Sequence, residues 1–354
     1  MFENLKVIEL AGVLAGPSVG MFFAELGAEV IKVENAKTGG DMTRKWKLPS
    51  EDPKAKTSAY FSAVNYNKKY IFKDLSNPDD QQEIHDLIKS ADIVLTNFKK
   101  GSDKKFNMDY KTLSAMNPSL IYGSISGFNS IEEKVAFDLV LQAETGFMFM
   151  NGTPESGPVK MPVALIDVLA AHQLKEGILI ALLKKQASDV GAHVSVSLEE
   201  SALASLANQA CNYLMANHIP QRMGSLHPNI APYGEIVKTK DGFSLVLAIG
   251  TNKQFKAFCE IIGKPELIVD LRFTENNKRV INREVLGGVL SKSVSEFLKD
   301  DLMTKCLINK VPVGEIKNME QVMNNEVAQK MILEETIEGE STKRLKTVAF
   351  NISE

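Results

Sequence analysis

A single carboxylate, Asp167, stands within an apolar run of the sequence. The run covers residues 161–171 and leads into residues 166–185, whose apolar residues recur at helical spacing. Because burying an unpaired charge is costly, a carboxylate in such a place is either a helix cap or a functional group. As an N-cap it would contribute about 1 kcal/mol, and as a nucleophile it would need an apolar pocket with backbone N–H groups nearby. The residues alone leave both interpretations open.

A second carboxylate, Asp138, follows Phe137 and precedes Gln142 and Gly146. Its side chain could assist or orient Asp167. It could equally cap the helix that follows it.

A glycine loop follows the first predicted strand, with Gly12, Gly16 and Gly20 four residues apart. Gly16 would let the backbone approach a ligand, and Pro17 suits the first turn of a helix whose N-terminus can receive a phosphate or a carboxylate. Glu34 closes the next strand, about where dinucleotide-binding folds place a ribose-binding acid. The glycine spacing differs from the dinucleotide fingerprint, so spacing alone favours a tight turn and a surface glutamate.

Amide and basic side chains gather near the ends of two other predicted strands. Both groups should lie near the edges of one parallel sheet, and ligands of such sheets bind beyond the carboxyl ends of the strands. Phe98 could stack on a base while lysines hold phosphates, although a solvated lysine-rich surface is the alternative. The residues concerned are Asn65, Asn67, Lys68, Lys69, Asn97, Phe98, Lys99, Lys100, Lys104 and Lys105.

An alternation of strands and helices would hold these groups. Strands are predicted at residues 5–10, 30–34, 69–72, 93–95, 120–125 and 191–198, and helices at 18–26, 79–90, 110–116, 166–185 and 199–215. This alternation predicts an α/β fold with an open parallel sheet covered by helices on both faces.

Proline and glycine then punctuate residues 220–234, and a smaller α+β module follows. Its predicted strands are 236–238 and 244–249, and its predicted helices are 252–262, 283–290 and 294–298. We therefore expect a large domain over 1–215, rejoined by about 311–354, and a small domain over 225–310.

The composition excludes several classes of protein. A formal net charge of -3 argues against general nucleic-acid binding. Cys211, Cys259 and Cys306 are scattered, which fits a reducing cytoplasm, and no clustering of cysteine or histidine indicates a metal site. The N-terminus lacks a signal-peptide pattern, and no apolar run approaches the roughly 18 residues of a membrane span. A nucleophile elbow and a P-loop are also missing from the sequence.

Taken in order, the motifs resemble the family III CoA-transferases, the family of the formyl-CoA:oxalate and carnitine CoA-transferases, to which the α-methylacyl-CoA racemases are related. The resemblance covers nearly the whole chain, and the ordered set is far more specific than any one motif. The matching segments are residues 14–17, 26–34, 39–44, 65–69, 97–98, 117–122, 126–128, 167, 177–182, 232–234 and 240–242.

The resemblance implies a Rossmann-like large domain, a small domain in mid-chain and a homodimer of interlocked subunits, with the active site between the large domain of one subunit and the small domain of the other. It implies that Asp167 attacks an acyl-CoA thioester, passing through a mixed anhydride and an aspartyl-CoA thioester. CoA is then a co-substrate, and no metal or redox cofactor is expected. Positions that contact CoA in relatives match Val13, Ala15, Asn97, Phe98 and Lys105, and we add Gly16 from the glycine loop.

Three departures from the family pattern bear on the substrate. Leu14 stands where the oxalate enzymes carry a glutamine, Asn35 replaces a common basic residue, and no glycine-rich flap occurs near residues 225–232. Leucine cannot donate a hydrogen bond, so formyl-CoA and oxalate are not the expected substrates.

The main alternative is a racemase acting on 2-methylacyl-CoA. In racemases a histidine precedes the acidic residue in the slot of Phe137-Asp138, and phenylalanine cannot deliver a proton in a two-base mechanism. We therefore favour a CoA-transferase acting on small or medium carboxylates. A non-catalytic CoA-binding protein would be favoured if Asp167 were capped away from any cleft, and the glycine spacing disfavours a nicotinamide dehydrogenase.

Overall fold

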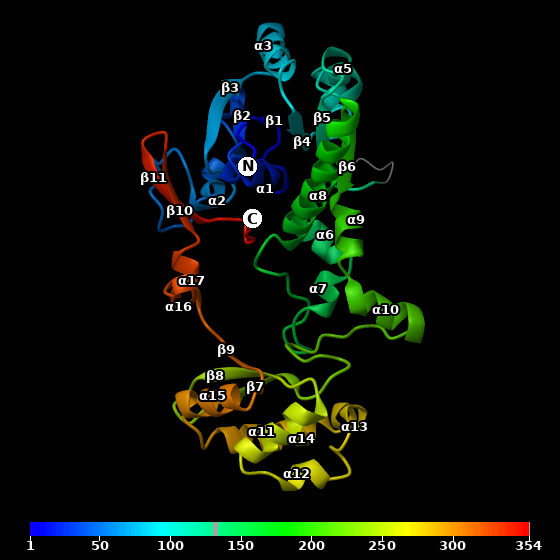
Figure 1. Cartoon of the computed structure of the whole chain (residues 1–354), viewed down its shortest axis with the longest axis vertical. Helices are drawn as coiled ribbons and strands as arrows, with labels where there is room; N and C mark the ends of the chain where they lie inside the picture. The colour runs from blue at the N-terminus through cyan, green and yellow to red at the C-terminus, as the bar shows by residue number, and fades with distance from the viewer. Residues whose placement is uncertain (130–133, 354) are drawn as a thin grey trace. The chain divides into compact units, whose positions relative to one another are not determined.

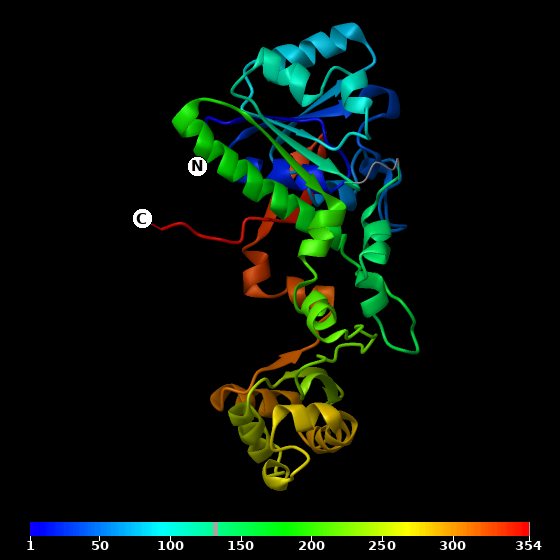
Figure 2. The same ribbon diagram turned by 90° about the vertical axis from the view of Figure 1, so that its right-hand side faces the viewer.

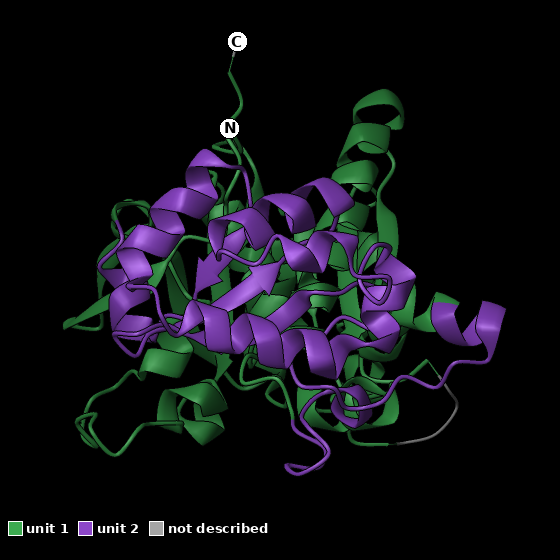
Figure 3. Cartoon of the chain, turned by 90° about the horizontal axis from the view of Figure 1, so that it is seen from below, with its two compact units in different colours: residues 1–147, 160–211, 326–354 green, residues 148–159, 212–325 purple. Residues whose placement is uncertain are grey.

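The computed structural model of the chain describes residues 1–129 and 134–353, which form two compact units (Figure 3). The first comprises Met1–Phe147, Lys160–Cys211 and the segment from Glu326 onward, and the second comprises Met148–Val159 and Asn212–Asn325. The second unit thus takes in a stretch ahead of the long helix and continues past residue 310. The domain boundaries drawn from the sequence, 1–215 with 311–354 and 225–310, stay a prediction.

The first unit is built on a six-stranded sheet in the order β3-β2-β1-β4-β5-β6, and every neighbouring pair is parallel. The strands are β1 (Lys6–Glu9), β2 (Glu29–Asn35), β3 (Lys68–Lys73), β4 (Ile93–Thr96), β5 (Ile121–Ser126) and β6 (Ala192–Ser197) (Figure 1). The predicted α/β fold with a Rossmann-like parallel sheet is confirmed. The strand order reverses at β1, between β2 and β4, where a crevice for a ligand opens in such sheets.

Each face of the sheet has its own apolar core, because successive residues of a strand point to opposite faces. Val7 belongs to the core that α1 (Ala15–Glu25) and α8 (Leu165–Ser188) cover with Val19 and Leu174. Ile8 belongs to the other core, which α3 (Pro78–Ile88) and α5 (Tyr110–Met116) cover with Ile84 and Leu113. Figure 2 shows the long α8 helix lying along one side of the sheet.

The first unit also contains short elements in the loops of the sheet and a separate C-terminal hairpin. The hairpin strands, β10 (Ile332–Ile337) and β11 (Glu340–Leu345), are antiparallel. Glu340 accepts hydrogen bonds from the N–H groups of Lys56 and Thr57, which ties the hairpin to the segment ahead of α2 (Ala59–Ser62). The other short elements of this unit are η1 (Ala36–Thr38), η2 (Met42–Lys45), α4 (Ser102–Lys105), α6 (Asp138–Glu144) and α17 (Glu326–Gln329). The short helix α7 (Phe147–Met150) begins at Phe147 and otherwise belongs to the second unit.

The predicted helix over residues 199–215 is wrong, because two helices, α9 (Leu198–Ala204) and α10 (Ala207–Ala216), occupy this stretch. Ala207 has a φ of 46°, a left-handed conformation that a continuous helix cannot contain.

The second unit holds a three-stranded antiparallel sheet of β7 (Tyr233–Lys238), β8 (Ser244–Ala248) and β9 (Val313–Glu315). Its helices are α11 (Asn252–Ile261), α12 (Glu266–Val269), α13 (Asn276–Ile281), α14 (Arg283–Val294), α15 (Lys299–Ile308) and α16 (Met319–Met323). The predicted helix over 294–298 is wrong, because Val294 ends α14 and residues 295–298 form the turn to α15. At the start of α15, Asp241 accepts a hydrogen bond from the Lys299 N–H. Among the helices that the structure describes, none is both long and apolar enough to cross a membrane.

Candidate active site

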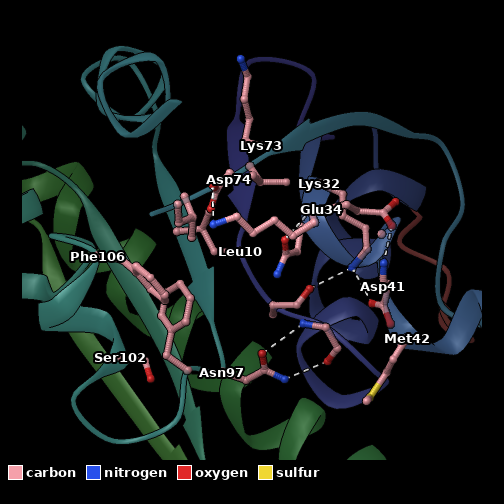
Figure 4. Close-up of a pocket in the computed structure, with 18 of the residues that line it drawn as sticks. Leu10, Lys32, Glu34, Asp41, Met42, Lys73, Asp74, Asn97, Ser102 and Phe106 are labelled. Carbon is pink, nitrogen blue, oxygen red and sulfur yellow. Dashed lines mark hydrogen bonds and ion pairs between the residues drawn. The ribbon is translucent and has the colours of Figure 1, made fainter. Parts of the chain in front are cut away.

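A cavity of about 610 Å³ opens at the carboxyl ends of the central strands, at the point where the strand order reverses (Figure 4). Its lining comes from the loops that follow β1, β2, β3 and β4, and it includes Val13, Asn97, Phe98 and Lys105. Four of the six residues that the sequence suggested for CoA therefore line one cavity.

A second cavity, of about 110 Å³, contains both candidate carboxylates, Asp167 and Asp138. Gly12, Val13 and Asn97 line this cavity as well as the larger one, so the two cavities share a wall. Ala15 lines this cavity together with Asp167. The remaining lining residues are Leu14, Ile125, Ser126, Gly127, Ala136, Phe137 and Leu198.

Gly16 lines neither cavity. A Cβ atom at this position would lie well inside contact distance of the Ala11 Cβ. Glycine is therefore required here by the close packing of α1 on the loop after β1, and the approach of the Gly16 backbone to a ligand stays a prediction.

Asp167 is the third residue of α8, and its side chain does not cap that helix. The residue is only 8% exposed, and its carboxylate makes no hydrogen bond to any residue within 1–129 and 134–353. Burial, and then the negative charge of Asp138, raises the pKa of Asp167 to about 7. A helix N-terminus alone would lower this pKa, so burial beside a like charge dominates.

Asp138 holds the start of the helix that carries Asp167. One carboxylate oxygen accepts a hydrogen bond from the Ile166 N–H at 2.7 Å, and the other accepts one from the Gln142 amide at 2.6 Å. Gln142 in turn accepts from the Met161 N–H at 2.8 Å. Asp138 does not cap its own helix, α6. It instead satisfies one of the first free N–H groups of α8.

A third ionisable group near the carboxylates is Tyr60, which sequence reasoning missed. Burial raises the pKa of Tyr60, and the charges of Asp167, Asp138 and Asp41 raise it further. The phenol therefore stays protonated. Tyr60 comes from α2, where the Trp46 ring packs against it edge-on at 5.1 Å. No sequence spacing links this short segment to the other site residues.

The first turn of α1 offers backbone donors at the smaller cavity. Leu14 occupies the N-cap position, and no side chain caps the helix. Within the described residues, the N–H groups of Leu14, Ala15 and Gly16 have no acceptor. Leu14 and Ala15 line the smaller cavity together with Asp167. These two N–H donors and the candidate nucleophile therefore lie around the same small cavity.

Glu34 is neither a surface residue nor free to bind a ribose. Its carboxylate is buried and accepts hydrogen bonds from the Arg44 guanidinium and, at 2.6 Å, from the Asp41 N–H. Both interpretations drawn from its position in the sequence are therefore wrong.

The larger cavity carries cations on its rim. Lys37 pairs with Asp74 at 2.8 Å, and Lys73 pairs with Asp80 at 3.1 Å. Lys99 and Lys105 are exposed, and neither forms an ion pair with a residue of the described ranges. Asn35, which replaces a basic residue, accepts from the Lys37 N–H at 2.9 Å and so caps η1.

The rings of Phe98 and Phe106 line the same cavity, and their centroids are 6.1 Å apart. The Lys105 Nζ lies 5.7 Å from the centroid of the Phe106 ring. The earlier part of the amide and basic set lies elsewhere. Residues 65–68 precede or begin β3, and hence lie at the edge of the sheet opposite the carboxyl ends. Lys68 is buried in a salt bridge with Glu9 at 2.8 Å.

Comparison with known proteins identifies the family of the chain. The sequence model described as CoA-transferase family III matches residues 2–353. The succinate–glutarate CoA-transferase of Agrobacterium fabrum is 38% identical over 344 residues, which cover 96% of this chain and 85% of that protein. The human succinyl-CoA:glutarate CoA-transferase is 33% identical over 323 residues, covering 90% of this chain and 72% of that protein.

A solved structure is similar over the same length. The crystal structure of a CAIB/BAIF family protein from Brucella suis has a TM-score of 0.83 at 34% identity, covering 99% of this chain and 92% of that one. The matching family and the named relatives agree with the resemblance read from the motifs. The chain belongs to CoA-transferase family III and is an enzyme that transfers coenzyme A from an acyl-CoA to a carboxylic acid.

Proposed function

We propose that Asp167 is the nucleophile of this transfer and carries each acyl or CoA group in turn. The observation that supports this most strongly is a nine-tenths buried carboxylate without a hydrogen bond from any described residue, in a cavity that shares a wall with a larger one. Such a carboxylate is poorly solvated, which makes its ionised form reactive toward a thioester.

The proposed sequence has four steps. The Asp167 carboxylate attacks the thioester carbonyl, and the C–S bond breaks to give a mixed anhydride and CoA thiolate. The thiolate attacks the Asp167 acyl carbon, which releases the donor acid and leaves an aspartyl-CoA thioester. The acceptor carboxylate attacks that thioester, forming a second anhydride and thiolate. The thiolate then attacks the acceptor's acyl carbon and regenerates Asp167.

Negative charge builds on a carbonyl oxygen in each step. The N–H groups of Leu14 and Ala15 are placed to receive it, because they line the Asp167 cavity and have no acceptor among the described residues. Donors fixed in a dry site stabilise such an oxyanion far more than water does. Asp138 acts through the backbone of Ile166 and is a positioning residue.

The larger cavity is proposed to hold the nucleotide part of CoA. Phe98 and Phe106 offer faces for the adenine, while Lys99 and Lys105 offer charges for phosphates. Val13 and Asn97, which line both cavities, then lie where the pantetheine arm passes from one to the other, and Ala15 lies near the thioester.

Dicarboxylic acids of four or five carbons are the proposed substrates. Succinate and glutarate appear in the names of the relatives in Agrobacterium fabrum and humans. Leu14, in the cavity wall, gives an oxalate no side-chain donor. The interlocked homodimer is also proposed. Large apolar residues exposed on α8 and α10, among them Leu183, Leu214 and Met215, offer surface for a second copy. A location in the cytoplasm stays a prediction.

A CoA-exchange assay tests this function. The protein is incubated with succinyl-CoA and glutarate, and glutaryl-CoA is quantified against a reaction without acceptor. Exchange that needs both substrates supports the proposal. Deuterium uptake at C2 of 2-methylacyl-CoA without exchange would support the racemase instead. The Phe137 side chain argues against racemisation. Racemisation needs a second base, and the phenylalanine that lines the Asp167 cavity cannot take up or deliver a proton.

A further inference from the structure

Val13 adopts a backbone conformation that its side chain disfavours. Its φ is 71°, in the left-handed region, where glycine is at ease and a β-branched residue is a clear outlier. Strained residues of this kind persist only where their surroundings fix them, and they concentrate at functional sites. Because Val13 lines both cavities, its strain lies in the wall that they share.

The loop that holds the strained residue is fixed by two side chains, from the segments that follow β2 and β4. The Val13 N–H donates to the Asp41 carboxylate at 3.1 Å. Asn97, after β4, accepts from the Gly12 N–H at 3.0 Å and donates to the Gly12 carbonyl at 2.8 Å. Figure 4 shows Asn97 and Asp41 on opposite sides of this loop.

Asp41 is itself held in place. Its side chain is buried and accepts from the Thr43 N–H at 3.0 Å and the Thr43 hydroxyl at 2.8 Å. Lys32 stands 3.1 Å from the second oxygen and also pairs with Glu9 at 2.9 Å. Burial alone would raise the pKa of Asp41, but Lys32 and Thr43 outweigh it and keep this pKa below its usual value. The acceptor for the Val13 N–H is thus a carboxylate that Thr43 and Lys32 hold in place.

We propose that Asp41 is a positioning residue of the transfer reaction: it holds Val13 left-handed, and so fixes both the wall between the cavities and the first turn of α1. The proposal rests on the transfer by Asp167 described above. The Val13 side chain forms the wall between the cavities, but the Val13 backbone has a conformation suited to glycine. The hydrogen bond from the Val13 N–H to the charged Asp41 carboxylate offsets the resulting strain. Relaxation of Val13 to negative φ would swing Leu14 and Ala15, the next two residues, away from Asp167.

The test is a comparison of Asp41→Asn in three backgrounds: Val13, Val13→Ala and Val13→Gly. Glycine adopts φ near 70° without strain, whereas alanine removes the side chain but retains the strain. The rate of Asp167 acylation is measured in single turnover with succinyl-CoA at saturation. We expect Asp41→Asn to slow acylation about tenfold in the Val13 and Val13→Ala backgrounds and less than about threefold in Val13→Gly. An equal loss in all three backgrounds, or no loss in any, overturns the proposal.

A stability comparison keeps the test decisive if Asp41→Asn does not fold. The midpoint of thermal unfolding should be higher for Val13→Gly than for Val13→Ala, the reverse of the usual order. A higher midpoint for Val13→Ala would contradict the strain. Asp109→Asn is the matched control for Asp41→Asn. Asp109 also accepts a hydrogen bond from a threonine, Thr112, but it lines neither cavity. If the unsubstituted protein is not acylated at Asp167, the proposed function fails instead.

Discussion

The Asp138 carboxylate accepts a hydrogen bond from the Ile166 N–H, so the residue directly before Asp167 is tied to a second carboxylate. The contact does two things at once. It fixes the first turn of α8, and it brings a negative charge close enough to raise the pKa of Asp167. A helix cap and an electrostatic effect on the proposed nucleophile therefore come from a single side chain.

Asp138→Asn separates these two effects. The amide oxygen can still accept from the Ile166 N–H, while the new amide NH2 group loses the hydrogen bond from Gln142. Because the charge is lost, the pKa of Asp167 should fall from about 7. Because the ionised form attacks, the rising limb of kcat/KM against pH should move to lower pH. Glu144→Gln, on the same helix but outside the cavity, is the control. An unchanged profile, or one moved to higher pH, would contradict this account.

Asp167→Asn should remove activity and stabilise the fold at alkaline pH. The pKa of Asp167 is raised on folding, so the folded chain binds the proton more tightly than the unfolded chain. The wild type therefore loses stability as the pH rises from about 4 to about 7, and the deficit stays constant above that. At pH 8 the substitution should stabilise by roughly 2–4 kcal/mol, measured by urea unfolding.

Asp109→Asn is a control that should change the free energy of unfolding in the opposite direction. Burial would raise the pKa of Asp109, but hydrogen bonds from Thr112 outweigh it and lower this pKa. Asp109 therefore contributes stability above its unfolded pKa, and Asp109→Asn should destabilise at pH 8. A destabilised Asp167→Asn at the same pH would show that the Asp167 carboxylate is not buried unpaired.

Lys105→Ala should weaken CoA binding without slowing acylation at saturating donor. Lys105 is exposed and unpaired among the described residues, so the loss should be modest, about three- to tenfold in KM, and should shrink at high salt. Dephospho-CoA thioesters show whether the 3′-phosphate is its partner. Lys111→Ala, an exposed lysine of α5 outside both cavities, should leave KM unchanged.

Much of the large cavity could be predicted from the sequence, because the loops after parallel strands converge at one edge of the sheet. Apolar periodicity located β4, and Asn97 and Phe98 directly follow its end, whereas Val13 was suggested by the family resemblance. The same argument misplaced residues 65–68, since β3 begins at Lys68 and the preceding residues lie at the opposite edge. The error lay not in the strand, which was predicted at 69–72, but in grouping the residues ahead of its start with those beyond the end of β4.

Other features left no local signal. Tyr60 and Asp41 reach the site through tertiary packing of short segments, and no spacing relates them to Asp167. Alanine favours helices, so the left-handed Ala207 that separates α9 from α10 could not be foreseen. Glu34 looked exposed at a strand end, but Arg44 buries it by hydrogen bonding to both carboxylate oxygens.

Peptide mass spectrometry tests the central claim most directly. The protein is incubated with succinyl-CoA, treated with hydroxylamine or borohydride, digested and compared with an Asp167→Asn sample. The account predicts a trapped modification at Asp167, absent from the variant and dependent on the thioester. Transfer of CoA to glutarate that proceeds without any modification of Asp167, or that survives in Asp167→Asn, would contradict it.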